Sequence, residues 1–255
     1  MMHGFLRFTL VGVLLALVLC PILVHAEDDP IVQADNLYKQ RFDLNNVITA
    51  IDLLAKFIEK EPGNYDALWR LARLHWYRGD RTPAPKKGEE NTRLLLFEKG
   101  RGYAEQAVKA NDGGIDGHYW LAALIGNYGK ERGVLKSLFL VPSMRKEIDR
   151  CLQIDNTYAD AHYISALLLW EVPGIAGGNK KKAQEEARLA TVYDPNAIDH
   201  WMTYGQYASG NKDYATARMA LGKALSLPDD PEDPISSQED KATAREELKK
   251  IEGKG

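Results

Sequence analysis

The feature that most constrains this fold is a helical pattern that recurs five times. In each copy, small and apolar residues follow one another at intervals of three or four, which places them on one stripe of a helix. The copies are Val47, Ala50, Leu54 and Phe57; Phe97, Gly100, Ala104 and Ala107; Val141, Met144, Ile148 and Cys151; Lys180, Ala183, Ala187 and Ala190; and Tyr214, Ala217, Leu221 and Ala224. Such repetition predicts stacked helical units.

A second helix precedes the later copies, and three of these begin with an acidic residue, at Asp116, Asp160 and Asp199. The last unit, from Trp201 to Pro228, is similar to the tetratricopeptide pattern of an aromatic residue, a large-small pair and spaced alanines. We therefore expect an all-α tetratricopeptide-type solenoid of about five helix pairs over residues 27–228. The sequence contains no strand pattern.

Three insertions shorten from one unit to the next, over residues 81–92, 129–140 and 173–178. Each is expected between the two helices of a pair. Loops inserted at one corresponding point of each repeat emerge on one edge of the stack, which makes that edge a candidate functional surface.

The two ends of the chain differ from the repeats. Arg7, the apolar run from Thr9 to Leu19 and the sequence Val-His-Ala at 24–26 predict a signal peptide over residues 1–26 and an exported, periplasmic protein. A lipid-anchored form through Cys20 is the alternative. At the other end, residues 229–236 are expected to form a stiff acidic linker, and residues 237–255 a capping helix that begins at Ser237.

No group of residues predicts catalysis, a metal or a cofactor. His118, His162 and His200 are expected at equivalent positions of successive repeats, too far apart to share one metal ion. Cys151 occupies a position that favours a small buried residue. The formal net charge of −3 argues against a nucleic-acid binder. We expect a protein that binds and is not an enzyme.

Aromatic residues supply the candidate binding site. In a tetratricopeptide stack the first helices line the concave side, so they are expected to present a row of rings to a peptide or an apolar ligand. The expected row is Trp69, Tyr119, Tyr163 and Trp201, with Trp76 and Trp170 deeper. The alternative is packing between repeats. The candidate groove residues are Trp69, Trp76, Tyr119, Tyr163, Trp170 and Trp201.

The second insertion is too apolar for a free loop. It is expected either to close over the groove as a lid or to be buried against another subunit or a partner. The residues concerned are Leu135, Leu138, Phe139 and Leu140.

Three segments are similar to the T component of TRAP transporters (tripartite ATP-independent periplasmic transporters). They are residues 118–122, residues 133–138, and residues 171–174 with 177–183. This resemblance implies a periplasmic trimer with a hydrophobic channel or cavity, lipid anchoring, and association with a substrate-binding protein. A more distant likeness is to the eukaryotic regulators of microtubule dynamics, a setting that the export signal disfavours.

The leading functional hypothesis is an accessory component of solute uptake that binds a protein partner and an apolar small molecule. The alternative is a general periplasmic interaction scaffold with a peptide-binding groove.

Overall fold

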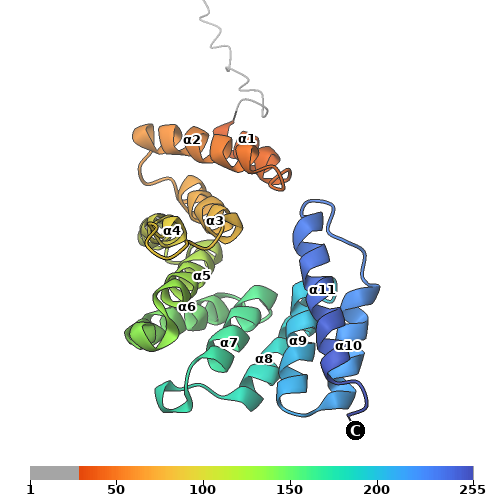
Figure 1. Cartoon of the computed structure of the whole chain (residues 1–255). Coiled ribbons are helices and arrows are strands. Elements are labelled where there is room, and N and C mark those ends of the chain that lie inside the picture. The colour runs from red at the N-terminus through yellow and green to blue at the C-terminus, as the bar shows by residue number, and fades with distance from the viewer. Residues whose placement is uncertain (1–28, 255) are drawn as a thin grey trace, which may run out of the picture.

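The computed structural model describes residues 29–254, so the predicted signal peptide and Cys20 lie outside the described residues. Within this range every regular element is helical (Figure 1). The pairs are α1 (Pro30–Tyr38) with α2 (Leu44–Lys60), α3 (Tyr65–Arg81) with α4 (Thr92–Ala110), α5 (Ile115–Arg132) with α6 (Val141–Ile154), α7 (Ala159–Glu171) with α8 (Lys180–Tyr193), and α9 (Ile198–Gly210) with α10 (Tyr214–Ser226). Helix α11 (Pro234–Lys250) follows. The predicted helical-repeat solenoid is confirmed.

Polar side chains begin many of the helices. The carboxylate or amide oxygens of Asp43, Asn64 and Asn179 each accept a hydrogen bond from a backbone N–H of the first turn, which satisfies a donor that the helix leaves unpaired. Helix α11 begins in the same way at Asp233, with Pro234 at its first position. Ser237, which was expected to cap this helix, instead lies buried within it.

Small residues allow the helices to pack closely. Gly100 of α4 lies so near α3 and α5 that a Cβ atom there would be 2.9 Å from Leu124 and 3.0 Å from the Cβ of His75. In α9, a Cβ on Gly205 would lie 2.5 Å from Leu221 of α10. The buried residues form four clusters along the stack, as expected for an array in which each unit packs mainly against its neighbours.

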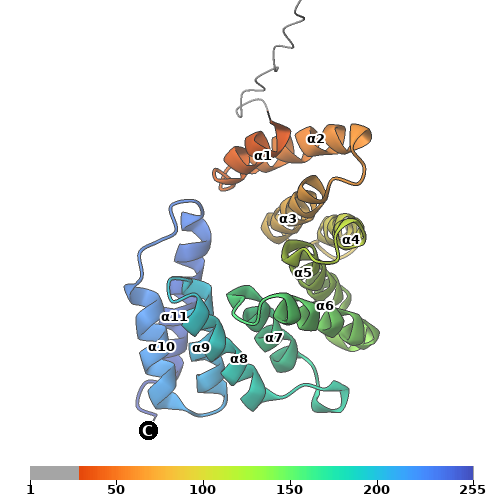
Figure 2. The same cartoon turned by 180° about the vertical axis from the view of Figure 1, so that it is seen from behind.

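The stack bends into an arc (Figures 1 and 2). Helices α3, α5, α7 and α9 follow one another on its inner side, and α4, α6, α8 and α10 lie outside them. Helix α11 packs against both α9 and α10, as a capping helix should. No helix among residues 29–254 has the length and apolarity needed to cross a bilayer.

The two ends of the arc touch. Arg41, in the turn between α1 and α2, forms ion pairs with Asp230, Glu232 and Asp233 of the acidic linker, at 3.1, 3.3 and 3.5 Å. Arg81 of α3 reaches Glu239 of α11 at 2.8 Å. We call these contacts the clasp. The linker is therefore docked on the first repeats, whereas its composition suggested only a stiff spacer.

The three insertions lie between paired helices, as expected. The second begins later than predicted, because α5 continues to Arg132, and it contains the 3-10 helix η2 (Val134–Leu140). The third contains the short 3-10 helix η3 (Gly174–Ala176).

Candidate functional site

Four inner helices each carry an aspartate in their first turn: Asp66 in α3, Asp116 in α5, Asp160 in α7 and Asp199 in α9. Neighbouring aspartates of this series lie close enough for their charges to interact, because the charge of Asp66 acts on Asp116 and that of Asp160 acts on Asp199. Asp240 of α11 extends the series, because the charge of Asp199 acts on its carboxyl group. This set, with the tyrosines described next, is the candidate site.

Tyr119 of α5 and Tyr163 of α7 lie between these carboxylates. Burial, with the nearby charges of Asp160 and Asp199, raises the pKa of the Tyr119 hydroxyl. Burial together with Asp199 and Asp240 does the same for Tyr163. Each tyrosine therefore senses carboxylates of two neighbouring helices. We define the inner face as Asp116, Tyr119, Asp160, Tyr163, Asp199 and Asp240.

Within the described part of the chain, the carboxylates of the inner face form no direct ion pair with Lys or Arg, although the charges of Arg70 and Arg73 act on Asp116 and that of Arg81 acts on Asp240. Among residues 29–254, no Lys or Arg forms an ion pair with Asp116, Asp160, Asp199 or Asp240, and the partner of Asp160 is His200 Nε2 at 3.4 Å. Burial raises the pKa of Asp116 and Asp199. For Asp240, burial and the charge of Asp199 raise the pKa to about 7. The site can therefore accept added positive charge.

At the α3 end of the arc, in contrast, the carboxylate is paired with arginines. Arg70 and Arg73 both bind the carboxylate of Asp35, at 2.8 and 2.7 Å. The guanidinium of Arg70 also lies 4.1 Å from the centre of the Trp69 ring, within the range of cation–π attraction. The cations here already have partners, so Trp69 lies in a charge-balanced cluster.

Most of the predicted groove aromatics pack between repeats. Trp76 of α3 meets Trp120 of α5 at 5.5 Å between ring centres, and Trp170 of α7 stacks on Tyr207 of α9 at 4.1 Å. The ammonium of Lys180 also lies 3.8 Å from the centre of the Trp170 ring. These rings join neighbouring units, which was the alternative explanation for them.

Tyr119 and Tyr163 also make ring contacts with the next unit. Tyr119 contacts Tyr158 edge-on at 5.7 Å, and Tyr163 lies 4.9 Å from the His200 ring. Both tyrosines are half-buried. They are the two predicted groove residues that the structure places among the carboxylates of the inner face.

Trp201 does not align with the other three residues of the expected row. It follows Asp199 by two positions, as His118 follows Asp116 and His162 follows Asp160, whereas Trp69, Tyr119 and Tyr163 follow their aspartates by three. Trp201 Nε1 donates to the carbonyl oxygen of Pro195 six residues earlier, at 2.9 Å. The ring nitrogens of His118 and His162 make the same contact with Asp112 and Asn156, at 2.9 and 3.1 Å. Trp201 therefore occupies the same helix position as His118 and His162, whose side chains contact a carbonyl oxygen in the turn before the helix.

His118 and His162 are held by carboxylates. His118 Nδ1 lies 2.6 Å from Glu147, and His162 Nδ1 lies 2.8 Å from Glu186, each on the following outer helix. His200 is one position earlier in its helix, so the three histidines are not equivalent, contrary to the expectation. His118 and His162 therefore each connect the two helices of one repeat.

The apolar insertion packs on its own chain in part. Leu138 and Leu140 contact the core cluster between α5, α6 and α7. Leu135 and Phe139 point outward, with 75% and 66% of their surface exposed. Because η2 packs against α5 and α6, intramolecular packing covers two of the four predicted interface or lid residues.

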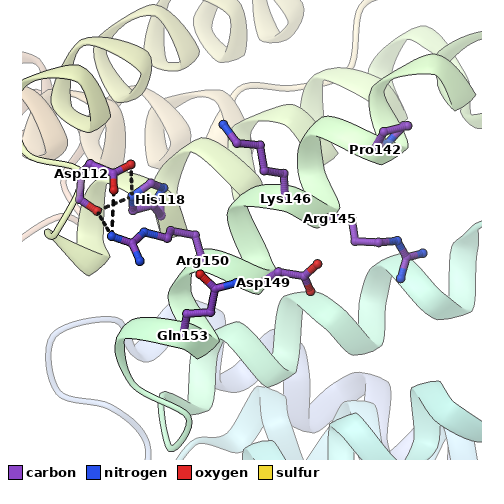
Figure 3. A pocket seen from close by; sticks show the side chains of 8 residues that line it. All are labelled: Asp112, His118, Pro142, Arg145, Lys146, Asp149, Arg150 and Gln153. Carbon is purple, nitrogen blue, oxygen red and sulfur yellow. Dashed lines mark hydrogen bonds and ion pairs between the residues drawn. The ribbon is translucent and has the colours of Figure 1, made fainter.

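A shallow pocket of about 500 Å³ lies on the outside of α6 (Figure 3). Figure 3 shows Arg150 turned toward Asp112, with which it pairs at 2.7 Å, while Arg145 points away from that pair. The lining residues are Asp112, His118, Pro142, Arg145, Lys146, Asp149, Arg150 and Gln153. Its mixed charges favour no single ligand, and the sequence contained no pattern that pointed to it.

The inner carboxylates were themselves missed as a site. The sequence pattern predicts these aspartates only as residues that begin helices, although they recur at one position of each inner helix. Asp240 had no such pattern to identify it.

Comparison with solved structures supports the fold. A thermophilic tetratricopeptide protein of Thermus thermophilus is similar over 86% of this chain and 99% of its own, at 16% identity and a TM-score of 0.63. MamA (residues 41 to the end) of Desulfovibrio magneticus RS-1 is similar over 78% of this chain and 95% of its own, at 14% identity and a TM-score of 0.50. No curated protein matched this chain.

A family model gives a more specific assignment. The model described as "Regulator of microtubule dynamics protein 1-3" matches residues 31–184, which is more than half of the chain. This is the second, more distant likeness noted in the sequence, and not the transporter component. The chain therefore belongs to the family of regulator of microtubule dynamics proteins 1-3.

Proposed function

We propose that this protein is a non-catalytic interaction scaffold whose inner face binds a basic segment of a partner protein. The observation that carries the proposal is the series Asp116, Asp160, Asp199 and Asp240, which forms no ion pair with a Lys or Arg of the described residues. Lys or Arg side chains of a partner would supply the missing charge. A tetratricopeptide-type arc suits this role, because its inner helices present side chains in a regular series.

The tyrosines extend the recognition beyond charge. Tyr119 and Tyr163 are partly exposed beside the carboxylates, and an Arg guanidinium can pack on a tyrosine ring while it pairs with an acid. An extended segment with Arg or Lys at intervals therefore matches the inner face better than an acidic or wholly apolar one.

The test is binding of fluorescent peptides of scrambled Lys/Arg-rich and Glu/Asp-rich composition, measured by anisotropy at several salt concentrations. The double variant Asp160→Asn/Asp199→Asn should weaken binding of the basic peptides by about 10- to 100-fold, since each charged hydrogen bond contributes about 1.5–3 kcal/mol and the effects overlap. The matched control is Glu98→Gln/Glu105→Gln on the outer helix α4, where both residues are exposed. Equal binding of both peptide classes would contradict the proposal.

A periplasmic setting is part of the proposal, on the strength of the sequence of residues 1–26. Cell fractionation and N-terminal sequencing of the mature protein should find Glu27 first if the signal peptide is cleaved. Release from membranes only by detergent, with a modified Cys20, would favour the lipid-anchored form.

An accessory role in TRAP-type solute uptake is a second candidate, supported by the three segments that are similar to the T component. It predicts a trimer with a retained apolar molecule and a complex with a substrate-binding protein. Native mass spectrometry reports all three together. A monomer without a retained molecule would favour the general scaffold.

A further inference from the structure

Two insertions expose large apolar side chains to solvent. Leu135 and Phe139 of η2 are 75% and 66% exposed, and Ile175 of η3 is 99% exposed. An exposed apolar side chain of this size forgoes the favourable free energy that its burial would contribute. These three residues are accordingly candidates for contact with something outside the chain.

The two insertions are neighbours although they belong to different repeats. Arg145, near the start of α6, donates from Nη2 to the carbonyl oxygen of Gly177, at 3.4 Å. Ala176 packs against the same core cluster as Leu138 and Leu140. Figures 1 and 2 agree that the start of α6 and the loop between α7 and α8 lie side by side at the outer end of these repeats.

Basic residues surround the apolar ones. Residues 129–147 and 171–182 contain eight Lys and Arg against three Glu, although the whole chain has a net charge of −3. Of the three acids, Glu147 is buried against His118 and Glu131 pairs with Arg93. The cations are Lys130, Arg132, Lys136, Arg145, Lys146, Lys180, Lys181 and Lys182. We call these two ranges the basic apolar edge.

We propose that the basic apolar edge docks on the surface of an anionic lipid bilayer. Leu135, Phe139 and Ile175 would enter the headgroup region, and Lys136, Lys181 and Lys182 would lie among the lipid phosphates. Charge complementarity selects this occupant, because lysines that flank exposed apolar side chains are attracted to an anionic membrane surface.

A local probe tests the proposal in the full chain. Cys20→Ser leaves Cys151, which is buried and whose thiol pKa burial raises to about 12, so a new surface cysteine can be labelled selectively. With the environment-sensitive dye NBD on Ile175→Cys, phosphatidylcholine vesicles containing 30% phosphatidylglycerol should shift the emission to the blue. Pure phosphatidylcholine vesicles should not. The matched control is Val192→Cys on α8, which is 55% exposed and outside the edge.

The position of the dye separates this proposal from membrane binding by the N-terminal segment. Tethering through residues 1–28 would leave the dye at positions 175 and 192 equally unshifted, or shift both alike, and either result would overturn the proposal. A protein partner in place of a membrane would likewise leave the label at 175 unshifted by vesicles.

Reversing the charge of lysines in the basic apolar edge provides a second test of the proposal. Lys136→Glu/Lys181→Glu/Lys182→Glu changes three exposed residues of the edge. It should weaken vesicle affinity of the labelled chain by about 100-fold or more, since each Lys near an anionic surface contributes about fivefold. The control Lys56→Glu/Lys60→Glu/Lys109→Glu reverses the same charge at exposed sites elsewhere and should leave most of the affinity. If the two triple variants lost the same vesicle affinity, the loss would reflect net charge alone, and the proposal that this edge binds the membrane would be refuted.

Discussion

The guanidinium of Arg41 lies 3.1 Å from the carboxylate of Asp230, although 189 residues separate them in the chain. Arg41 is well covered, with 11% of its side chain exposed, and it also lies over the Tyr38 ring at 4.7 Å. The contact joins the first repeat to the linker that precedes the last helix. It makes the ends of the array neighbours.

Arg41→Ala should open the clasp. The loss of several charged hydrogen bonds is expected to lower the free energy of unfolding by about 1–3 kcal/mol. The radius of gyration by X-ray scattering should rise, and amide exchange should accelerate in α1, α2 and residues 227–236. Arg188→Ala, which breaks an exposed pair within α8, is the control and should change none of these. Unaltered exchange in Arg41→Ala would mean that the ends are held by other contacts.

Stability should fall as pH rises from about 4 to about 7 because of Asp240. Its carboxyl has a pKa of about 7 in the folded protein and an ordinary value of 3.8, so the folded state keeps a proton that the unfolded state releases in this interval. Asp240→Asn should raise the free energy of unfolding at pH 8 by about 1–3 kcal/mol, after allowance for its partial exposure, and change it little at pH 4. Urea denaturation at the two pH values measures the difference. A gain of equal size at both would exclude titration as its cause.

His162 should add a smaller effect of the same sign. Burial opposes charge on this ring, but the hydrogen bonds with Glu186 and the Asn156 carbonyl outweigh burial and raise its pKa above 6.5. Its stabilisation is therefore complete below pH 6.5 and is lost as pH rises through the folded pKa. Glu186→Gln should remove this part of the pH dependence, as followed by thermal melts between pH 5.5 and 8.5. A pH profile identical to that of the unaltered chain would contradict it.

Gly178→Ala should be strongly destabilising, by about 3 kcal/mol or more, because a Cβ atom there would fall on the carbonyl oxygen of Val172. The backbone of the third insertion would have to move. Gly222→Ala in α10 is the matched control: its Cβ would meet nothing within 4 Å, and alanine should stabilise that helix by about 1 kcal/mol. Chemical denaturation compares the two, and a tolerated Gly178→Ala would show that the insertion is free to rearrange.

Cys151 should resist thiol reagents in the native protein. Burial is the main cause that raises its pKa to about 12, so little thiolate forms at pH 8. In the Cys20→Ser chain, reaction with Ellman's reagent should require denaturant. Rapid reaction without denaturant would indicate local opening between α5 and α6.

The repeat architecture could be predicted because it depends on local patterns. The stripe of small residues in each outer helix and the Asp, Asn or Pro that ends it are visible within about 20 residues. The order of helices, the positions of the insertions and the terminal helix followed from them. Trp201 departs from the expected row, because it follows Asp199 by two positions and not by three, and an alignment on aromatic residues alone does not show the difference.

The clasp and the inner face depend on contacts that sequence spacing cannot specify. Nothing near Arg41 indicates that Asp230 will be its partner, since that pairing results from the curvature summed over all the repeats. The same holds for Asp240, which joins Asp199 only because α11 packs against α9. The exposed positions of Leu135 and Phe139 depend on how η2 rotates on α5, which composition does not determine.

The clasp also affects how the protein loses its structure. An open row of repeats has two unprotected ends, from which units can detach one at a time. With Arg41 bound to the linker, neither terminal unit can fray without breaking a contact made by the other. The array should therefore melt in a single cooperative transition, as a small globular domain does.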